Sequence, residues 1–246
     1  MTGRILIVGA TSAIAHAVAR RYAVRRASLY LLARRADLLS ENADDLRVRG
    51  ASDVRSATFD ALDIDSHAAT IAAAFAAFDG FDAVLVAHGV LPDQMRCQAS
   101  VAETLMSFDV NARSVIALLT PIAGAMERQG KGVIGVISSV AGERGRASNY
   151  VYGAAKAAVS TFAAGLRHRL HASNVRVVTV LPGFVDTPMT AAVQKGPLWA
   201  SPDRVAADIE AALDRRSGVV YTPGFWRVIM LLIRWVPERL FVRTKL

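Results

Sequence analysis

Short apolar runs that alternate with helical patterns are the feature that most constrains the fold of this chain. Runs of this kind are typical of strands buried on both faces of a sheet. They occur at residues 4–8, 28–33, 54–59, 82–87, 132–137, 175–181 and 219–221. Helices are predicted between them, over residues 13–24, 36–49, 66–78, 101–129, a segment with Tyr152 that ends near 171, and 202–215. This alternation favours an α/β fold, a doubly wound parallel (Rossmann-type) sheet of about seven strands flanked by helices.

The whole chain, residues 1–246, is expected to form one domain, because no linker, internal repeat or low-complexity stretch interrupts the pattern. Residues 223–246 form an apolar and basic C-terminal tail, with a predicted apolar helix. A hydrophobic content of 53% excludes a disordered chain. The single cysteine, Cys97, is interpreted as an ordinary small side chain and fits a reducing, cytoplasmic compartment.

Charge and hydropathy exclude several classes of protein. The first residues turn polar too soon for a secretory signal, and no run approaches the roughly 20 apolar residues that span a bilayer. The net charge of +8 fits an anionic partner and equally a solvated basic surface. No nucleic-acid-binding motif is present, and the histidines have no metal-ligand grouping. We therefore expect neither nucleic acid nor a metal ion.

A tight turn of small residues, 9–15 (GATSAIA), joins the first strand to the first helix. A strand, a small-residue turn and a helix N-terminus together make a phosphate site, because main-chain N–H groups and the helix dipole face the anion. Ala13 and Ala15 stand where glycines are usual, so the main chain must avoid positive φ there. An ordinary strand–helix turn is the alternative.

Residues 138–156 (SSVAGERGRASNYVYGAAK) read as a strand end, a loop and a helix that carries Tyr152 and Lys156. Residues four apart lie on one helix face, so the ammonium is expected to favour the phenolate and lower the phenol pKa. Tyr152 then becomes an acid or base near neutral pH, with Ser139 placed to hold the oxygen that Tyr152 protonates. A buried tyrosine and a solvated lysine are the alternative.

The ordered motifs resemble the short-chain dehydrogenase/reductase family along nearly the whole chain. The resemblance is carried by residues 9–15, Asp60, Gly89, Asn111, Ser139, Tyr152-x-x-x-Lys156 and Pro182-Gly183-x-x-x-Thr187. It implies an NAD(P)-dependent oxidoreductase with a catalytic tetrad of Asn111, Ser139, Tyr152 and Lys156. Tyr152 is then the proton donor or acceptor, Ser139 polarises the carbonyl, Lys156 holds the nicotinamide ribose and Asn111 supports a proton relay.

The same resemblance implies a set of cofactor-binding residues. Asp60 resembles the family's adenine contact, and Thr187 its carboxamide contact. The usual Asn-Asn-Ala-Gly is replaced by Val86-Ala87-His88-Gly89, which keeps the main-chain path without the asparagine side chains. We expect His88 to bind the local main chain, although a histidine there can also titrate near pH 6.5. The full expected set is Gly9, Thr11, Ser12, Ala13, Ile14, Arg34, Arg35, Asp60, Ala61, Ala87, His88, Gly89, Tyr152, Lys156, Pro182, Gly183, Val185 and Thr187.

The residues after the second strand predict the cofactor. An acidic side chain there binds both ribose hydroxyls and repels a 2′-phosphate. This chain has Ala33, Arg34 and Arg35 instead, and a guanidinium grips phosphate well. NADP(H) is therefore predicted over NAD(H), with Arg34 as the main contact. Two solvated arginines are the alternative.

The tail bears on the substrate. Its apolar block is too short to span a membrane, and tryptophan and arginine around it are typical of an interfacial anchor. Packing on the body of the protein, or on a second subunit, is the alternative. The tail, residues 60–67 and residues 138–156 resemble one subgroup, the decaprenylphosphoryl 2-keto-pentose (erythro-pentofuranosid-2-ulose) 2-reductases. This implies a polyprenyl-phosphate-linked keto sugar, peripheral contact with the inner face of the membrane, and Arg144 and Arg146 as phosphate contacts.

Three hypotheses remain open on the sequence. The chain is a reductase of a lipid-linked keto sugar, a reductase or dehydrogenase of a soluble ketone or alcohol, or a non-catalytic nucleotide-binding scaffold. Intact Ser139, Tyr152 and Lys156 count against the scaffold. The family resemblance also implies a homodimer or homotetramer, paired through the helices around Asn111 and Tyr152.

Overall fold

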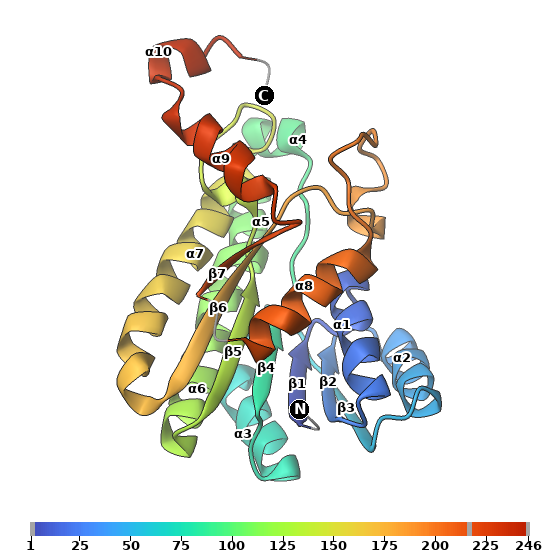
Figure 1. The fold of residues 1–246 in the computed structure, drawn as a ribbon. Coiled ribbons are helices and arrows are strands. Elements are labelled where there is room, and N and C mark those ends of the chain that lie inside the picture. Colours follow the sequence, from blue (N-terminus) through green and yellow to red (C-terminus); the bar gives the residue numbers. More distant parts are fainter. Residues whose placement is uncertain (1–2, 216–217, 245–246) are drawn as a thin grey trace.

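Seven parallel strands form one sheet in the order β3-β2-β1-β4-β5-β6-β7 (Figure 1). The computed structural model describes residues 3–215 and 218–244. The strands are β1 (Arg4–Val8), β2 (Ser28–Ala33), β3 (Asp53–Thr58), β4 (Ala83–Val86), β5 (Gly132–Ile137), β6 (Val175–Pro182) and β7 (Val219–Thr222). The predicted doubly wound parallel sheet is confirmed, and each predicted strand agrees with an observed one to within one residue at either end.

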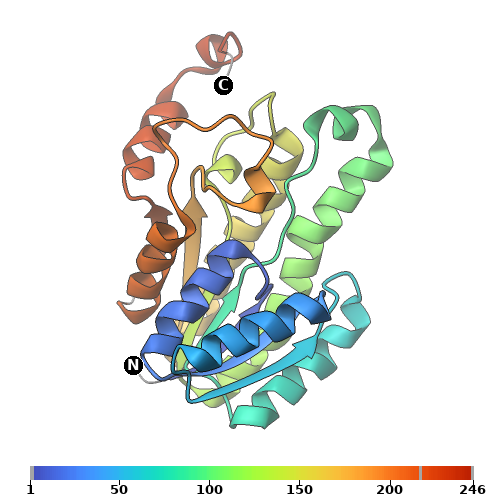
Figure 2. The same cartoon turned by 90° about the vertical axis from the view of Figure 1, so that its right-hand side faces the viewer.

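The strands are buried on both faces because helices cover the sheet from both sides. Successive side chains of β1 alternate: Ile5 and Ile7 join one core, and Leu6 and Val8 join the other. On the first side lie α1 (Ala13–Val24), α2 (Ala36–Val48) and α8 (Pro202–Asp214). On the other side lie α3 (His67–Phe78), α6 (Ser114–Gln129) and α7 (Tyr150–Leu170) (Figures 1 and 2).

The strand order reverses between β1 and β4, which are neighbours in the sheet but lie far apart in the chain. Chains that leave these two strands turn to opposite sides, and this opens a crevice at the carboxyl ends of the strands. The turn after β1 and the His88-Gly89 segment after β4 meet at this point. The strand order therefore places the candidate site at the carboxyl ends of β1 and β4.

The helix predicted over residues 101–129 is not continuous. It consists of α5 (Val101–Phe108), a π-helical turn (Asp109–Arg113) and α6. A short helix that the sequence analysis did not predict, α4 (Gln94–Ala99), precedes it, and the Asp93 carboxylate accepts hydrogen bonds from two main-chain N–H groups at its start. The π-helical turn carries Asn111, and its Val110 lines the groove described below.

The stretch Val101–Gln129 is the one helix of the described residues that is long and apolar enough to cross a membrane, by length and composition alone. In this fold its inner side packs on the sheet, with Leu118 and Ile122 fully buried. That packing accounts for the apolar residues on its inner side.

The C-terminal tail forms α9 (Trp226–Trp235) and α10 (Glu238–Phe241), which stand beyond the carboxyl ends of the strands (red in Figures 1 and 2). One side of α9 packs on the body, where Trp226 and Met230 join Val140 and Leu181 in a small separate core. The other side is exposed and apolar. We call it the outer tail face, and it consists of Phe225, Val228, Leu231, Leu232, Trp235, Leu240 and Val242. Lys245, which the sequence analysis counted among the basic residues of the tail, lies outside the described residues.

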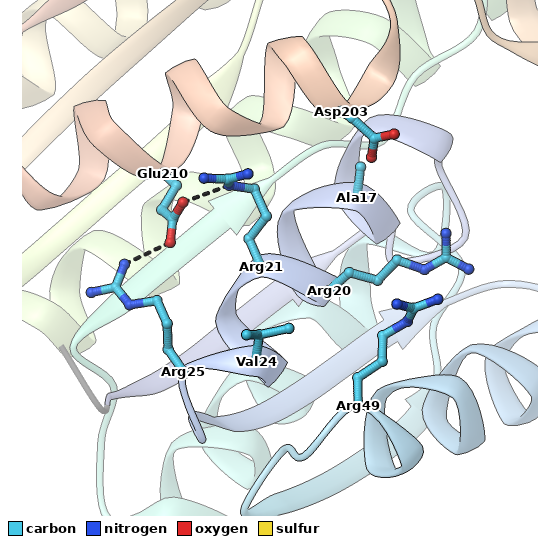
Figure 3. Close-up of a pocket in the computed structure, with 8 residues that line it drawn as sticks. All are labelled: Ala17, Arg20, Arg21, Val24, Arg25, Arg49, Asp203 and Glu210. Atoms are coloured by element: carbon cyan, nitrogen blue, oxygen red, sulfur yellow. Dashed lines mark hydrogen bonds and ion pairs between the residues drawn. The ribbon is translucent and has the colours of Figure 1, made fainter.

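An arginine-rich hollow lies between α1 and α8 (Figure 3). Glu210 accepts hydrogen bonds from Arg21 at 2.5 Å and from Arg25 at 2.7 Å. On the far side of the hollow, Arg20 and Arg49 both bind the Asp45 carboxylate. Because these guanidinium groups already have carboxylate partners, the hollow is interpreted as an ion-pair network that joins α1, α2 and α8.

Candidate active site

A groove of about 360 Å³ runs along the carboxyl ends of β1, β2 and β4. Most of the residues expected to bind the cofactor line it. They are Gly9, Thr11, Ser12, Ala13, Ile14, Arg34, Arg35, Asp60, Ala61, Ala87, His88, Gly89 and Thr187. The lining also includes Leu62, Val90, Val110, Pro188 and Met189, which the sequence analysis did not name. These are hydrophobic residues next to named motifs, and no sequence signal distinguishes them from other such residues.

Gly9 turns the chain from β1 into α1 and admits no other residue. Its φ is +82°, and a Cβ there would lie 2.6 Å from the main-chain nitrogen of His88. Ala13 and Ala15 lie inside α1 and have no positive φ, as predicted. The N-cap residue Ser12 makes no side-chain hydrogen bond to the helix, so the first N–H groups of α1 stay free toward the groove. A diphosphate fits such a turn.

Arg34 and Arg35 follow β2 and line the groove together with Asp60. Both guanidinium groups are exposed, and neither makes a hydrogen bond or ion pair within the described residues. The Asp60 carboxylate binds its own loop, where it accepts a hydrogen bond from the Leu62 N–H at 3.0 Å. Two free cations in place of an acidic side chain make this part of the groove suitable for a phosphate.

The prediction that His88 binds the local main chain is wrong. Its Nε2 lies 2.9 Å from the Ser114 hydroxyl, a side chain on α6, rather than against the main chain. Burial, with the nearby charge of Lys156 and the effect of His67, lowers the pKa of His88 to about 3. The imidazole is therefore neutral over the physiological range, and the alternative of a group that titrates near pH 6.5 is wrong.

Asn111 sits in the middle of the π-helical turn and is fully buried. Its amide nitrogen donates to the Ser107 carbonyl at 3.0 Å, and its amide oxygen accepts from the Val90 N–H at 2.9 Å. A Cβ on Gly89 would lie 2.9 Å from that oxygen and 3.5 Å from Lys156 Nζ. Gly89 is thus the spacer between two predicted catalytic side chains. π turns of this kind are frequent at functional sites.

Ser139 follows β5 and caps the short 3₁₀ turn Val140–Gly142, where its hydroxyl accepts from the Ala141 N–H at 3.1 Å. This turn presses on α7, because a Cβ on Gly142 would lie 2.7 Å from the Ala157 nitrogen. A Cβ on Gly153 would lie 2.7 Å from the Ala141 carbonyl oxygen. Two glycines therefore bring the loop with Ser139 against the helix that carries Tyr152.

Tyr152 and Lys156 share one side of α7, with Lys156 Nζ 5.6 Å from the centre of the tyrosine ring. Burial raises the pKa of Tyr152 to about 12, and the Ser139 hydroxyl beside it acts in the opposite direction. Burial also lowers the pKa of Lys156 to about 8. The expected fall in the phenol pKa is thus not found in the protein alone, because removal from water outweighs the neighbouring groups.

The ammonium of Lys156 donates to the Ile137 carbonyl at 3.1 Å. Ser138, to which the sequence analysis assigned no role, also binds α7. Its hydroxyl donates to the Lys156 carbonyl at 2.8 Å and lies 2.7 Å from Ser160 Oγ. Ser138 therefore ties the end of β5 to α7 beside both Ser139 and Lys156. A serine next to a predicted catalytic serine carries no signal of this role.

Five residues of the expected cofactor set lie outside the groove lining: Tyr152 and Lys156 on α7, and Pro182, Gly183 and Val185 after β6 or at its end. The Pro182 carbonyl faces the Ser139 hydroxyl at 3.5 Å, and Gly183 lies under the Trp226 ring. Val185 is buried and pairs with Ala200 in a single parallel bridge. Pro182, Gly183 and Val185 lead directly into the segment 186–200.

The two arginines expected to meet a phosphate differ in their surroundings. Arg144 is committed to the tail: it donates to the Val236 carbonyl at 2.6 Å and to the Glu238 carboxylate at 2.9 Å, and it lies 3.8 Å from the Phe241 ring centre. The expectation that Arg144 meets a phosphate is therefore not supported. Arg146 makes no hydrogen bond or ion pair within the described residues.

Cys97 is free and buried in α4, as expected of a small packing residue. Among residues 3–215 and 218–244, no cluster of three or more His, Cys, Asp or Glu side chains is placed to hold a metal ion.

Comparison with known proteins finds relatives over most of this chain. The family model for short chain dehydrogenases matches residues 4–197. An uncharacterized oxidoreductase of Mycobacterium tuberculosis H37Rv is 38% identical over 234 residues, covering 95% of this chain and 94% of that protein. Sulfoacetaldehyde reductase 2 of Chromohalobacter salexigens is 32% identical over 212 residues, covering 85% of this chain and 82% of that protein.

Solved structures show the same fold at low sequence identity. Levodione reductase superimposes with a TM-score of 0.82 at 21% identity, over 92% of this chain and 97% of the other. A short-chain type dehydrogenase/reductase of Mycobacterium ulcerans superimposes with a TM-score of 0.79 at 23% identity, over 94% of this chain and 95% of the other.

Proposed function

This chain belongs to the short-chain dehydrogenase/reductase family and is an NAD(P)-dependent oxidoreductase, and from that premise we propose that it is an NADPH-dependent carbonyl reductase. One observation carries the proposal. Ser139, Asn111 and the pair Tyr152 and Lys156 come from three separate segments; Asn111 and Lys156 meet at Gly89, which lines the groove, and Ser139 lies beside Tyr152. A non-catalytic scaffold would have no need of this arrangement.

The chemistry follows from these side chains. A bound nicotinamide cofactor supplies the hydride that attacks the carbonyl carbon. The Ser139 hydroxyl donates a hydrogen bond to the carbonyl oxygen, and Tyr152 transfers its phenolic proton to that oxygen as the negative charge develops. Lys156 and Asn111 return a proton to the phenolate. The high pKa of Tyr152 in the protein alone keeps it protonated, as a proton donor for reduction must be.

The cofactor preference rests on the adenosine end of the groove. Arg34 and Arg35 are both exposed there and have no partner among the described residues. A 2′-phosphate gives these guanidinium groups a charge-assisted, bidentate partner, whereas NADH offers only a hydroxyl. We therefore propose NADPH, with Arg34 as the main contact.

The substrate proposal rests on the tail. We propose that the ketone is a keto sugar carried on a polyprenyl phosphate, and that the outer tail face rests on the membrane that holds this lipid. Exposed apolar side chains such as Leu232 and Trp235 are flanked by Arg227, Arg234 and Arg239, the pattern of a helix that lies in a membrane interface. A soluble ketone is the competing substrate, in which case the outer tail face packs against another subunit.

We propose that two copies of this enzyme form a homodimer through α5 and α7. Val101, Leu105 and Met106 are apolar and exposed on α5, a helix that contacts α7. A second copy that covers them removes this apolar surface from water.

The direct test is oxidation of NADPH and NADH in mild detergent with a polyprenyl-phosphoryl 2-keto-pentose and with a panel of soluble ketones. Turnover with the lipid-linked sugar and NADPH supports the full proposal. Turnover only with soluble ketones retains the reductase and removes the lipid substrate. Absence of turnover with any carbonyl, together with normal cofactor binding, contradicts the proposed activity.

A further inference from the structure

The short segment after β4, residues 88–90, is joined to the π-helical turn at two points. The His88 imidazole meets the Ser114 hydroxyl, with 2.9 Å between Nε2 and Oγ. The Val90 N–H donates to the side-chain oxygen of Asn111 at 2.9 Å. The second contact holds the predicted catalytic asparagine directly, whereas the first reaches the end of the turn that carries it.

The Ser114 hydroxyl completes the hydrogen bonding of this turn. In a regular α-helix the Ser114 N–H would bind the carbonyl four residues back, that of Val110. In the π turn this N–H donates instead to the Asp109 carbonyl, five residues back. The Val110 carbonyl is left without its α-helical donor, and the Ser114 hydroxyl takes that place at 2.7 Å. Because Ser114 is fully buried, its hydroxyl depends on partners within the protein.

These contacts fix the position of the proton on the imidazole. A hydroxyl has one proton and the Val110 carbonyl can only accept, so the Ser114 proton points to that carbonyl. The Ser114 oxygen must then accept from the Nε2–H of His88. The imidazole is neutral, so Nδ1 carries no proton, and this nitrogen has no partner among the residues that the structure describes. The imidazole of His88 therefore binds the protein through Nε2 alone.

This chain of hydrogen bonds supports a kind of turn that helices rarely contain. A π turn holds one extra residue, and a return to regular α-helix would rotate its two sides by about 100° relative to each other. Asn111, in the middle of the turn, would then leave the Val90 N–H and its position across Gly89 from Lys156. A neutral histidine is suited to hold the turn, because it offers a donor without bringing a charge into a buried place.

We propose that His88 is a positioning residue for the reductase reaction: through Ser114 it holds the π turn in the shape that keeps Asn111 in the site. This inference rests on the proposed function, because it requires Asn111 to support the return of a proton to Tyr152. His88 also lines the cofactor groove, but it holds the turn through Nε2, without contact with the cofactor. Loss of the link should therefore lower kcat and leave the affinity for the cofactor nearly unchanged.

Ser114→Ala tests the link without changing a residue that lines the groove. The variant loses the partner of His88 and the donor to Val110, so kcat with NADPH and a ketone that the wild type reduces should fall by about fivefold or more. The Kd for NADPH should change by less than about twofold. The matched control is Thr120→Ala, an exposed residue of α6 whose hydroxyl likewise donates to the carbonyl four residues back, at 3.0 Å. Thr120→Ala should keep the wild-type kcat.

A double-mutant cycle with Asn111 distinguishes positioning from a general structural effect. In an Asn111→Ala background no side chain is left to position, so Ser114→Ala should change kcat by less than about 1.5-fold. A second fall of about fivefold in that background would show that Ser114 acts on another part of the site, and the proposal would be wrong.

Two replacements of His88 discriminate between its ring nitrogens. The side-chain amide of glutamine reaches about as far as Nε2, whereas that of asparagine reaches only about as far as Nδ1. His88→Gln should therefore retain at least about threefold more of kcat than His88→Asn. Equal losses in the two variants would contradict a role through Nε2.

Nuclear magnetic resonance separates this inference from the reductase activity, because it observes the turn without turnover. In protein labelled with nitrogen-15, His88 should show a protonated Nε2 and an unprotonated Nδ1. The side-chain amide signals of Asn111, identified by their absence in Asn111→Ala, should shift in Ser114→Ala and stay in place in Thr120→Ala. If the signals behave in this way but no ketone is reduced, the hold of His88 on Asn111 stands and the reductase proposal fails. If the Asn111 signals do not shift in Ser114→Ala, or if His88 carries its proton on Nδ1, the inference is wrong.

Discussion

The Trp226 ring lies directly over Gly183, so closely that a Cβ on Gly183 would be 1.9 Å from the indole. Trp226 begins α9, and Gly183 follows β6 at the base of the segment 186–200. The tail is therefore seated on the same main chain that supports the predicted carboxamide contact, Thr187. Arg144 makes a second connection, from the loop with Ser139 to the end of α9. The position of the tail and the geometry of the site are thus coupled.

Replacement of Gly183 tests whether the Trp226 ring packs directly on Gly183. Gly183→Ala should destabilise the protein by about 1–3 kcal/mol, because the new methyl group collides with a buried ring. In a Trp226→Ala background the same change should cost well below about 1 kcal/mol, since the obstacle is gone. Urea unfolding of the four proteins in this cycle measures the difference. Equal costs in both backgrounds would show that Trp226 does not rest on Gly183.

Tyr152→Phe tests the proton donor. The variant keeps the ring and its packing but has no proton to give, so turnover should fall by at least about a hundredfold. Binding of NADPH, followed by cofactor fluorescence, should be almost unchanged. Tyr150→Phe, a tyrosine two residues away in the same helix, is the control and should be fully active. Normal turnover of Tyr152→Phe would remove the tetrad assignment.

Lys156→Met should raise stability while it removes activity. Burial lowers the pKa of Lys156 from 10.5 to about 8, so at pH 7 the folded protein holds a cation that is disfavoured there. The neutral side chain should add on the order of 1–3 kcal/mol to the free energy of unfolding at pH 7.

The sign of the pH dependence can be checked on the same variant. Between pH 8 and 10.5 the unfolded chain binds a proton at Lys156 that the folded protein has lost, so wild-type stability gains from this group as pH rises. The advantage of Lys156→Met should therefore shrink from pH 7 to pH 9.5, measured by urea unfolding at each pH. An advantage that grows with pH would contradict the lowered pKa of Lys156.

Arg34→Ala tests the cofactor preference. The Kd for NADPH should rise by about tenfold or more, because a charge-assisted contact to the 2′-phosphate is lost, while the Kd for NADH should change by less than about twofold. Arg128→Ala serves as the charge-matched control. A parallel loss of both cofactors would place Arg34 away from the 2′-phosphate.

Two substitutions on the outer tail face, Leu232→Gln and Trp235→Gln, test contact with a lipid surface. Both side chains are exposed, 65% and 81% respectively, so the fold should tolerate the change. Co-sedimentation with vesicles that contain anionic lipid should fall several-fold in the double variant, because the buried apolar area at the interface is reduced. Val48→Gln, an equally exposed apolar residue on α2, is the control. If the wild-type protein does not bind vesicles, the membrane proposal is wrong, and the outer tail face is then a subunit contact.

Much of the fold followed from the sequence because its signals are local. The apolar runs and the helical patterns are properties of consecutive residues, and a parallel sheet buried on both faces requires such runs. The same holds for the turn at Gly9 and for the pairing of Tyr152 with Lys156 on one helix side. These features need only chain geometry, so residues 4–8 and 132–137 were predicted with the observed bounds.

The tertiary structure decided what depends on segments that are distant in the chain. The pKa of Tyr152 rises because neighbouring elements exclude water, an effect that a lysine four residues away does not reveal. Arg144 and Arg146 look alike in the sequence, yet only Arg144 meets the tail, which packs there because Trp226 fits over Gly183. A sequence specifies which side chains are present and their local spacing, whereas burial and partner choice depend on how the chain packs, and these set the charge and availability of each group.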